Sequence, residues 1–225
     1  MKTCIYFAES AGFSGRDGAV PRQEGPAEAL RLAVGYGFTP QGGWRGLPLP
    51  TGAAGLMLDD RWLPDRRGLA AAAEALAAWM APIVLDFERP PSASASGLIA
   101  ALAGKTLILP AAYAAQPHAA LLAGPWRGGG LLPWLDRTRR RWGAIWLDAL
   151  PLRYCQRPGA PRTPWTGPLP GLGFPCPGPG CLHRRLEDGT VLFWDTKETL
   201  TARCAAAGVP CIIFREDWER LPEGN

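Results

Sequence analysis

Two carboxylates, Asp86 and Glu88, end the apolar segment "APIVLDFERPP" (81–91), and two prolines close it. The segment is short and rich in branched apolar residues, which predicts a strand rather than a helix. Residues two apart on a strand point to the same side, with Cα atoms roughly 7 Å apart. A neighbouring charge and burial both raise a carboxyl pKa, so such a pair can supply a general acid. The alternative is that both carboxylates pair with an arginine or cap the next helix.

Acidic residues also follow most of the other apolar runs of the sequence, namely Glu9, Asp59, Asp148, Asp195 and Glu216. In a (β/α) barrel the carboxyl ends of the strands form the active-site face. We therefore expect Asp59 and Glu9 among the substrate-binding residues. Trp146 and Asp148 share one strand face and are candidates to bind a sugar ring and its hydroxyls. A core tryptophan beside an ion-paired aspartate is the alternative.

The elements that position these acids are strands alternating with helices. Apolar runs occupy 3–8, 54–59, 82–88, 106–110, 144–150, 190–195 and 210–215, and an eighth strand is expected near 32–38. Most runs are apolar throughout, as parallel strands covered on both faces are. Helices are predicted at 69–80, 95–103, 131–141 and 196–207. The alternation predicts an α/β protein with a (β/α) TIM-type barrel, small or incomplete, of seven to eight strands.

Length and composition predict one domain over residues 1–225, because 225 residues with 47% hydrophobic content can build a single core. A proline- and glycine-rich excursion at 156–181 is expected outside the strand–helix repeat and beside the site. The net charge of +4 is mild and needs no nucleic-acid partner. The loop after the first strand lacks a GxGxxG order, so no nucleotide is expected.

Cysteine usage and the amino terminus bear on compartment and cofactors. The six cysteines have no zinc-type paired spacing, and two histidines do not complete a metal set, so we predict no metal and no cofactor. The start "MKTCIYFAES" lacks an apolar stretch of signal-peptide length. The most apolar helix, 69–80, is too short to span a bilayer. We expect a soluble cytoplasmic protein with reduced thiols and no membrane partner.

One segment resembles a known family. "IVLDFE" (83–88) is similar to the latter half of the DxxDxDxE signature of family 18 glycoside hydrolases, which comprise chitinases and non-catalytic lectin relatives. Residues 187–214 are similar to that family's closing unit of hairpin, strand, helix and last strand. Family 25 lysozymes also place Asp-x-Glu at a strand end. The resemblance covers well under half of the chain and implies a TIM barrel that acts on N-acetylhexosamine-containing glycans.

The resemblance implies roles for three residues. Glu88 would be the general acid and base. Asp86 would orient the substrate N-acetyl group, which is the internal nucleophile in substrate-assisted retaining hydrolysis. Tyr154, in "LPLRYC", is the candidate to hold the acetamido oxygen, with a core tyrosine as the alternative.

The sequence also departs from the family signature. Ala81 and Val84 stand where the signature has its earlier acids, and Phe214 ends the last strand where a tryptophan is expected. Trp218 lies slightly beyond that position and is a candidate for substrate binding. The departures favour a non-catalytic barrel that binds a glycan or a protein partner, whereas the intact Asp86 and Glu88 favour a hydrolase. A barrel enzyme with unrelated chemistry is the third possibility, so activity stays open.

Overall fold

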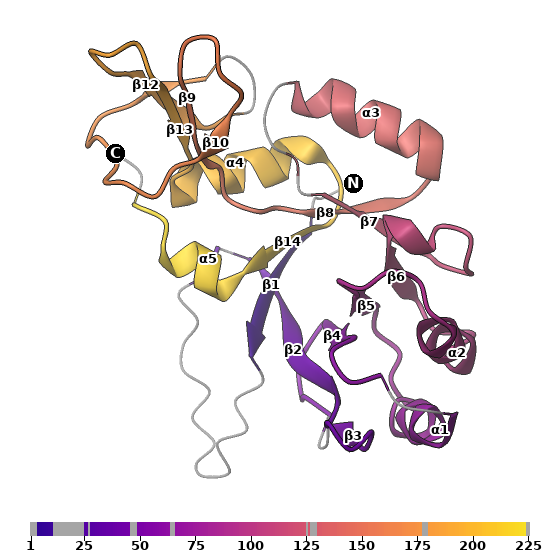
Figure 1. Ribbon diagram of the computed structural model, residues 1–225. Helices are drawn as coiled ribbons and strands as arrows, with labels where there is room; N and C mark the ends of the chain where they lie inside the picture. Colours follow the sequence, from indigo (N-terminus) through magenta and orange to yellow (C-terminus); the bar gives the residue numbers. More distant parts are fainter. Residues whose placement is uncertain are drawn as a thin grey trace.

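The computed structural model describes residues 4–10, 25–26, 28–45, 49–63, 66–124, 126, 130–176 and 180–223. In this part of the chain, eight parallel strands form a closed barrel, because β1 pairs with both β2 and β14 (Figure 1). The strands are β1 (Ile5–Ser10), β2 (Leu30–Phe38), β4 (Gly55–Asp59), β5 (Ile83–Asp86), β6 (Leu107–Pro110), β7 (Ala120–Ala123), β8 (Ile145–Asp148) and β14 (Cys211–Phe214). The predicted TIM-type barrel is confirmed, and the sheet is complete.

Two strand predictions differ from the structure. The barrel strand β7 was not predicted, because "ALLA" is short and half alanine, a residue depleted in strands. The run at 190–195 was predicted as a barrel strand, but its residues in β13 (Val191–Trp194) pair antiparallel with neighbours outside the barrel. Burial alternates along β13, as expected for a sheet with one packed face.

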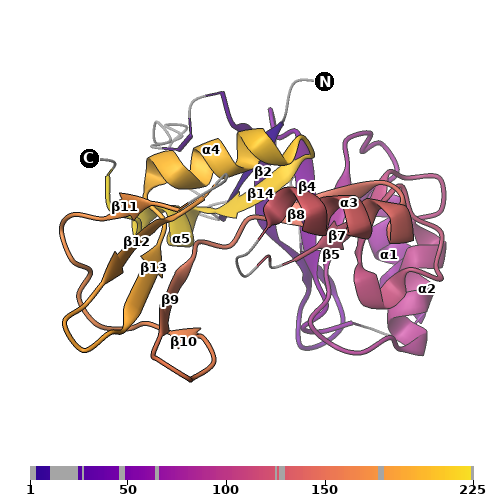
Figure 2. The same ribbon diagram turned by 90° about the horizontal axis from the view of Figure 1, so that it is seen from above.

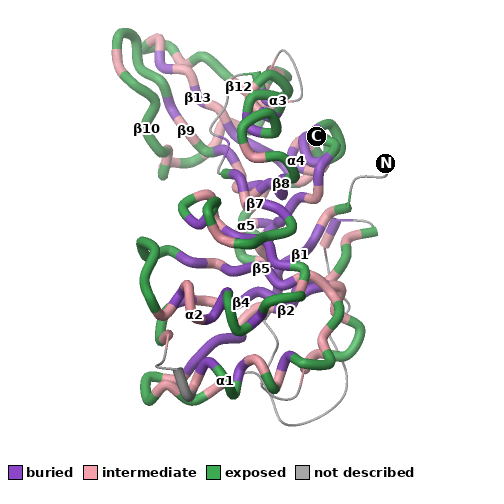
Figure 3. The backbone as a smooth tube through the Cα atoms, turned by 90° about the vertical axis from the view of Figure 1, so that its right-hand side faces the viewer, coloured by how far each residue is buried: buried purple, intermediate pink, exposed green. Residues whose placement is uncertain are grey.

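Side chains pack on both faces of the barrel strands. The interior is filled by alternate residues from the strands: Tyr6, Ala8, Leu32, Met57, Val84, Ile108, Ala120, Trp146 and Ile212. The intervening residues point outward and pack in two further clusters with residues of the surrounding helices. The strands are therefore buried along most of their length (Figure 3). This two-sided burial explains why the strand segments are apolar throughout.

Helices cover the outside of the barrel in two pairs. The helix α1 (Arg66–Ala75) contacts α2 (Ala93–Ala101), and α3 (Leu131–Trp142) contacts α4 (Lys197–Ala207) (Figure 1). Between β6 and β7 the chain makes only the 3₁₀ turn η1 (Ala111–Tyr113). The short helix α5 (Arg215–Glu219) follows β14 directly. Among the described residues, no helix has the length and hydropathy needed to cross a membrane.

A second, antiparallel sheet is inserted between β8 and α4. It is ordered β10-β9-β13-β12-β11 and stands to one side of the barrel (Figure 2). Its remaining strands are β9 (Arg153–Gln156), β10 (Thr163–Pro164), β11 (Phe174–Pro175) and β12 (Leu182–Arg185). The excursion expected at 156–181 lies within this insertion, which has its own small core of Cys155, Leu192 and Trp194. The six cysteines, all within the described ranges, form no disulfide bond.

Candidate functional site

Three aspartates lie at the carboxyl end of the barrel. Asp59, Asp86 and Asp148 are the last residues of β4, β5 and β8. The residues two positions earlier belong to the interior cluster: Met57, Val84 and Trp146. Because strand side chains alternate, the three carboxylates share the interior side of the barrel. Asp59 and Asp86 are also register partners on adjacent strands. The structure therefore brings these predicted site residues to one end of the barrel.

Asp148 is the most strongly perturbed aspartate of this group. Burial, with a smaller contribution from the negative charges of Asp86 and Asp217, raises the pKa of Asp148 to about 6. Its Oδ1 atom is buried and has no hydrogen-bond partner among the described residues. Burial also raises the pKa of Asp86, and the nearby Glu88 adds to this effect. With its pKa of about 6, the Asp148 carboxyl group stays protonated into the mildly acidic range, as a general acid requires.

Asp59 has a different environment from Asp148. Its Oδ2 atom lies 2.9 Å from Arg45 Nη2, where Arg45 belongs to the short strand β3 (Trp44–Arg45) beside β2. Its Oδ1 atom accepts a hydrogen bond of 3.1 Å from the backbone N–H of Arg61. The Asp59 carboxylate is thus held by a cation and a backbone donor. We infer that it fixes the loop after β4 rather than transferring protons.

A glycine leaves the space that Asp148 occupies. Gly124, the residue after β7, has a φ of +156°, which side-chain-bearing residues rarely adopt. A Cβ atom at this position would lie 2.8 Å from the Asp148 Cβ. Any larger residue would therefore displace the end of β8. The aspartate is positioned by close backbone packing as well as by its own strand.

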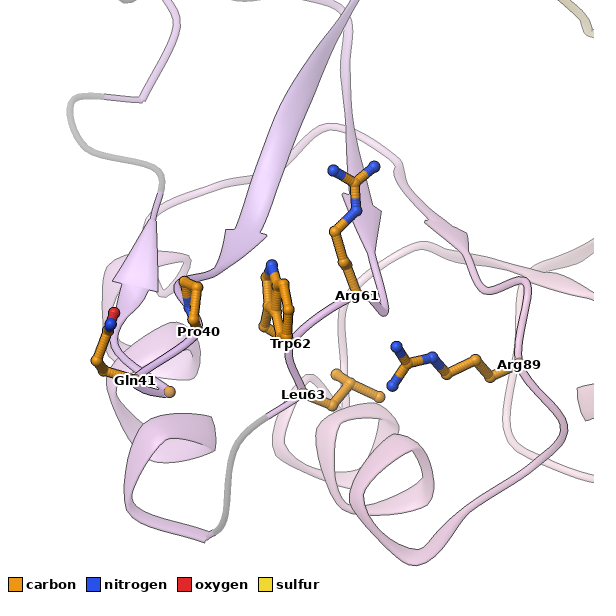
Figure 4. Close-up of a pocket in the computed structure, with 7 residues that line it drawn as sticks. Pro40, Gln41, Arg61, Trp62, Leu63 and Arg89 are labelled. Carbon is orange, nitrogen blue, oxygen red and sulfur yellow. The ribbon is translucent and has the colours of Figure 1, made fainter.

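A pocket opens on the rim of the barrel on the side of Asp59 and Asp86, although neither residue lines it. A cavity of about 430 Å³ lies between the loops after β2, β4 and β5 (Figure 4). Its lining consists of Pro40, Gln41, Gly42, Arg61, Trp62, Leu63 and Arg89. These residues were not predicted from the sequence, because turn residues have no periodic pattern. The sequence signal that could have found them is "DDRW" (59–62), in which a tryptophan follows strand-end acids. In the structure the side chain of this Trp62 is 42% exposed.

Glu88 and Trp146 are near the site but differ from expectation. Glu88 lies two residues beyond the end of β5 and is exposed, so it belongs to the rim. Trp146 is buried inside the barrel and stacks on Tyr6 with ring centroids 4.3 Å apart. Its indole packs in the core beneath Asp148, as in the alternative of a core tryptophan, but no described residue forms an ion pair with Asp148. The sugar-binding role of Trp146 stays a prediction, which the burial of its ring does not favour.

Three further candidates do not face the interior of the barrel. Glu9 points outward from β1 and pairs with Arg31 Nε at 2.7 Å. Trp218 is buried in the outer core, edge-on to Phe7 with centroids 6.4 Å apart. Tyr154, expected on a later barrel strand, lies in β9 of the antiparallel sheet. Strand phase turns Glu9 outward, strand pairing places Tyr154 outside the barrel, and Trp218 lies on the buried side of the helix α5. Sequence spacing alone gives none of these.

Comparisons with known proteins add no assignment to this geometry. Within the described ranges, no group of three or more His, Cys, Asp or Glu side chains is arranged to hold a metal ion. The chain matches no protein-family model, no curated protein and no solved structure. The resemblance to family 18 glycoside hydrolases therefore has support at the level of a TIM-like barrel and no further.

Proposed function

We propose that the protein is a glycoside hydrolase-like barrel that acts on N-acetylhexosamine-containing glycans, with Asp148 as the proton donor. The observation that carries this proposal is the buried Oδ1 of Asp148 at the carboxyl end of the barrel, which has no partner among the described residues, together with the pKa of about 6 of this carboxyl group. The oxygen of a glycosidic bond must be protonated as that bond breaks, and a carboxyl group with a raised pKa supplies the proton.

Asp86 is the second residue of the proposed mechanism. In substrate-assisted retaining hydrolysis the acetamido oxygen of the substrate attacks the anomeric carbon while the acid protonates the leaving oxygen. Asp86 would orient and stabilise the acetamido group, as the family resemblance implies. The ionised Asp148 would then take a proton from the water that opens the cyclic intermediate. Glu88, which the resemblance names as the acid, is the alternative donor, but its exposure gives it a weaker claim.

A non-catalytic barrel that binds a glycan or a protein is the second candidate. One observation favours it: Val84 is wholly buried in the barrel interior, where the family signature carries an aspartate. A proton shared between that aspartate and Asp86 would be missing. The glycan-binding surface would still be present on the rim. Turnover separates this candidate from the hydrolase.

The test is hydrolysis of chitin oligomers and peptidoglycan fragments by the wild type and four variants. We expect Asp148→Asn to lower turnover by ~10²–10⁴-fold, as removal of a general acid does, and Asp86→Asn to lower it as well. Asp136→Asn is the matched control, since Asp136 pairs with Arg140 on the surface of α3. Unchanged turnover in Asp148→Asn would contradict the proposal. Loss confined to Glu88→Gln would return the acid role to Glu88, and glycan binding without turnover would favour the non-catalytic barrel.

A further inference from the structure

The rim pocket has the chemistry of an anion site. We propose that it is a subsite for a sugar that carries a negative charge, either a carboxylate or a phosphate. The inference rests on the proposed function for the glycan class, and it adds which kind of glycan fits. It depends on Arg61, Arg89 and Trp62, all of which line the cavity of about 430 Å³.

The two arginines are available to a ligand. In the part of the chain that the structure describes, neither guanidinium lies within ion-pair distance of a carboxylate, whereas Arg45 nearby is paired with Asp59 at 2.9 Å. Arg89 extends across the pocket towards Leu63 and Trp62 (Figure 4). A guanidinium presents a planar fork of N–H donors that matches the oxygens of a carboxylate or phosphate. Both side chains are exposed, so an anion can reach them without breaking an ion pair to any described residue.

The backbone that carries these arginines is fixed. The buried carboxylate of Asp60 accepts a hydrogen bond of 2.9 Å from the Arg89 N–H, which joins the loop after β4 to the loop after β5. The Tyr113 hydroxyl donates to the Arg89 carbonyl at 3.4 Å. The backbone N–H of Arg61 donates a hydrogen bond of 3.1 Å to Asp59 Oδ1 and holds the backbone of Arg61 in place. The backbone positions of both arginines are thus fixed before a ligand arrives, which reduces the entropy lost on binding.

Trp62 supplies the apolar surface of the pocket. Its side chain is 42% exposed, in contrast to the buried Trp146 inside the barrel. Figure 4 shows the Trp62 ring standing between Pro40 and Arg61. An aromatic face of this kind packs against the C–H face of a sugar ring while the neighbouring arginines contact its charged substituent.

The charges of the rim and of the barrel mouth would orient the substrate. Arg61 follows Asp59 by two residues, and Arg89 follows Asp86 by three. The Cα atoms of each arginine and its preceding aspartate are therefore at most about 7 to 11 Å apart. The acids repel a negatively charged sugar, and the arginines attract it. The charged sugar would therefore occupy the rim pocket and leave an uncharged glycosidic bond at Asp86 and Asp148.

The test compares two hexasaccharides by isothermal titration calorimetry. Hyaluronan hexasaccharide contains uronate carboxylates between its N-acetylglucosamine units, and chitohexaose contains N-acetylglucosamine alone. We expect hyaluronan hexasaccharide to bind about tenfold more tightly at low salt, the effect of one charge-assisted contact, and the preference to shrink as salt is added. Tighter binding of N-acetylglucosamine 6-phosphate than of either hexasaccharide, again salt-dependent, would identify phosphate as the preferred anion.

Variants connect the preference to the pocket. Arg61→Gln and Arg89→Gln should each remove most of the preference and leave chitohexaose affinity within about twofold, because only the charged contact is lost. Arg137→Gln, an exposed arginine on α3, is the control and should keep the preference. Two results would overturn the subsite even if Asp148→Asn abolishes turnover. One is equal affinity for the two hexasaccharides with no tighter binding of N-acetylglucosamine 6-phosphate. The other is a preference for the charged ligand that both arginine variants keep. A pocket-dependent preference without any turnover would support the subsite and count against the hydrolase.

Discussion

Asp148, the proposed proton donor, illustrates at the scale of one residue how a buried carboxyl group lowers stability. Burial raises its pKa from 3.8 to about 6, so between these values the folded protein holds a proton that the unfolded chain has lost. The free energy of unfolding therefore falls as the pH rises through this window. Above about pH 6 the whole penalty is present, on the order of 3 kcal/mol for a shift of this size. Below about pH 4 it disappears.

Replacement of this one carboxyl group tests that penalty. Asp148→Asn cannot ionise, so we expect it to raise the free energy of unfolding by up to about 3 kcal/mol near pH 8 and to change it little near pH 4. Urea denaturation of the wild type and variant at both pH values measures the difference. A variant that is equally destabilised at both would show that the carboxyl makes a structural contact instead.

Strand phase determines how far single residues could be predicted. Asp86 and Asp148 were correctly placed at the barrel end, because they close strands whose preceding residues are apolar. Glu9 follows a strand of the same kind, yet Tyr6 and Ala8 face the interior and turn Glu9 outward. The phase of β1 becomes known only when its partners are known. Arg61, Trp62 and Arg89 were missed because their positions depend on loops that pack together in the fold.

At the scale of elements, β13 shows that apolar content does not identify a strand's partners. Its sequence "VLFW" resembles a barrel strand, and the Asp195 that follows resembles another active-site acid. The structure instead buries Asp195 against Arg203, with Oδ2 at 2.7 Å from Nη1. Asp195 Oδ2 also accepts from the Leu152 N–H at 2.6 Å, and Arg203 donates to the Leu150 carbonyl at 2.9 Å. The pair joins α4 to the chain that leads into the antiparallel sheet.

Loss of this buried pair should be severe. Arg203→Met leaves the Asp195 carboxylate buried without its cation, so we expect the free energy of unfolding to fall by about 3–5 kcal/mol. The control is Arg140→Met, which removes an exposed pair with Asp136 and should change stability by less than about 1 kcal/mol. Chemical denaturation of the two variants measures both changes. Equal, small effects would mean that water or another group replaces Arg203.

At the scale of the whole molecule, the barrel and the antiparallel sheet differ in how they are held together. The barrel is closed by the pairing of β1 with β14 and has a continuous interior, while Cys155, Leu192 and Trp194 form a separate cluster in the antiparallel sheet. The two outermost strands of that sheet, β10 and β11, are two residues each and exposed. We infer that the barrel does not depend on the proline- and glycine-rich segment that contains them.

Replacement of residues 157–180 by a flexible linker tests this independence. Because β9 and β12 flank β13 on opposite sides, the linker must span two strand spacings, about 10 Å, and also run back along the strand for a similar distance. Six to eight Gly and Ser residues are long enough. We expect a lower melting temperature, since Gly173 no longer covers Trp194, but unchanged amide-exchange protection in β4, β5 and β6. If protection in these strands falls together with that of the antiparallel sheet, the two units unfold as one and the segment contributes to the barrel core.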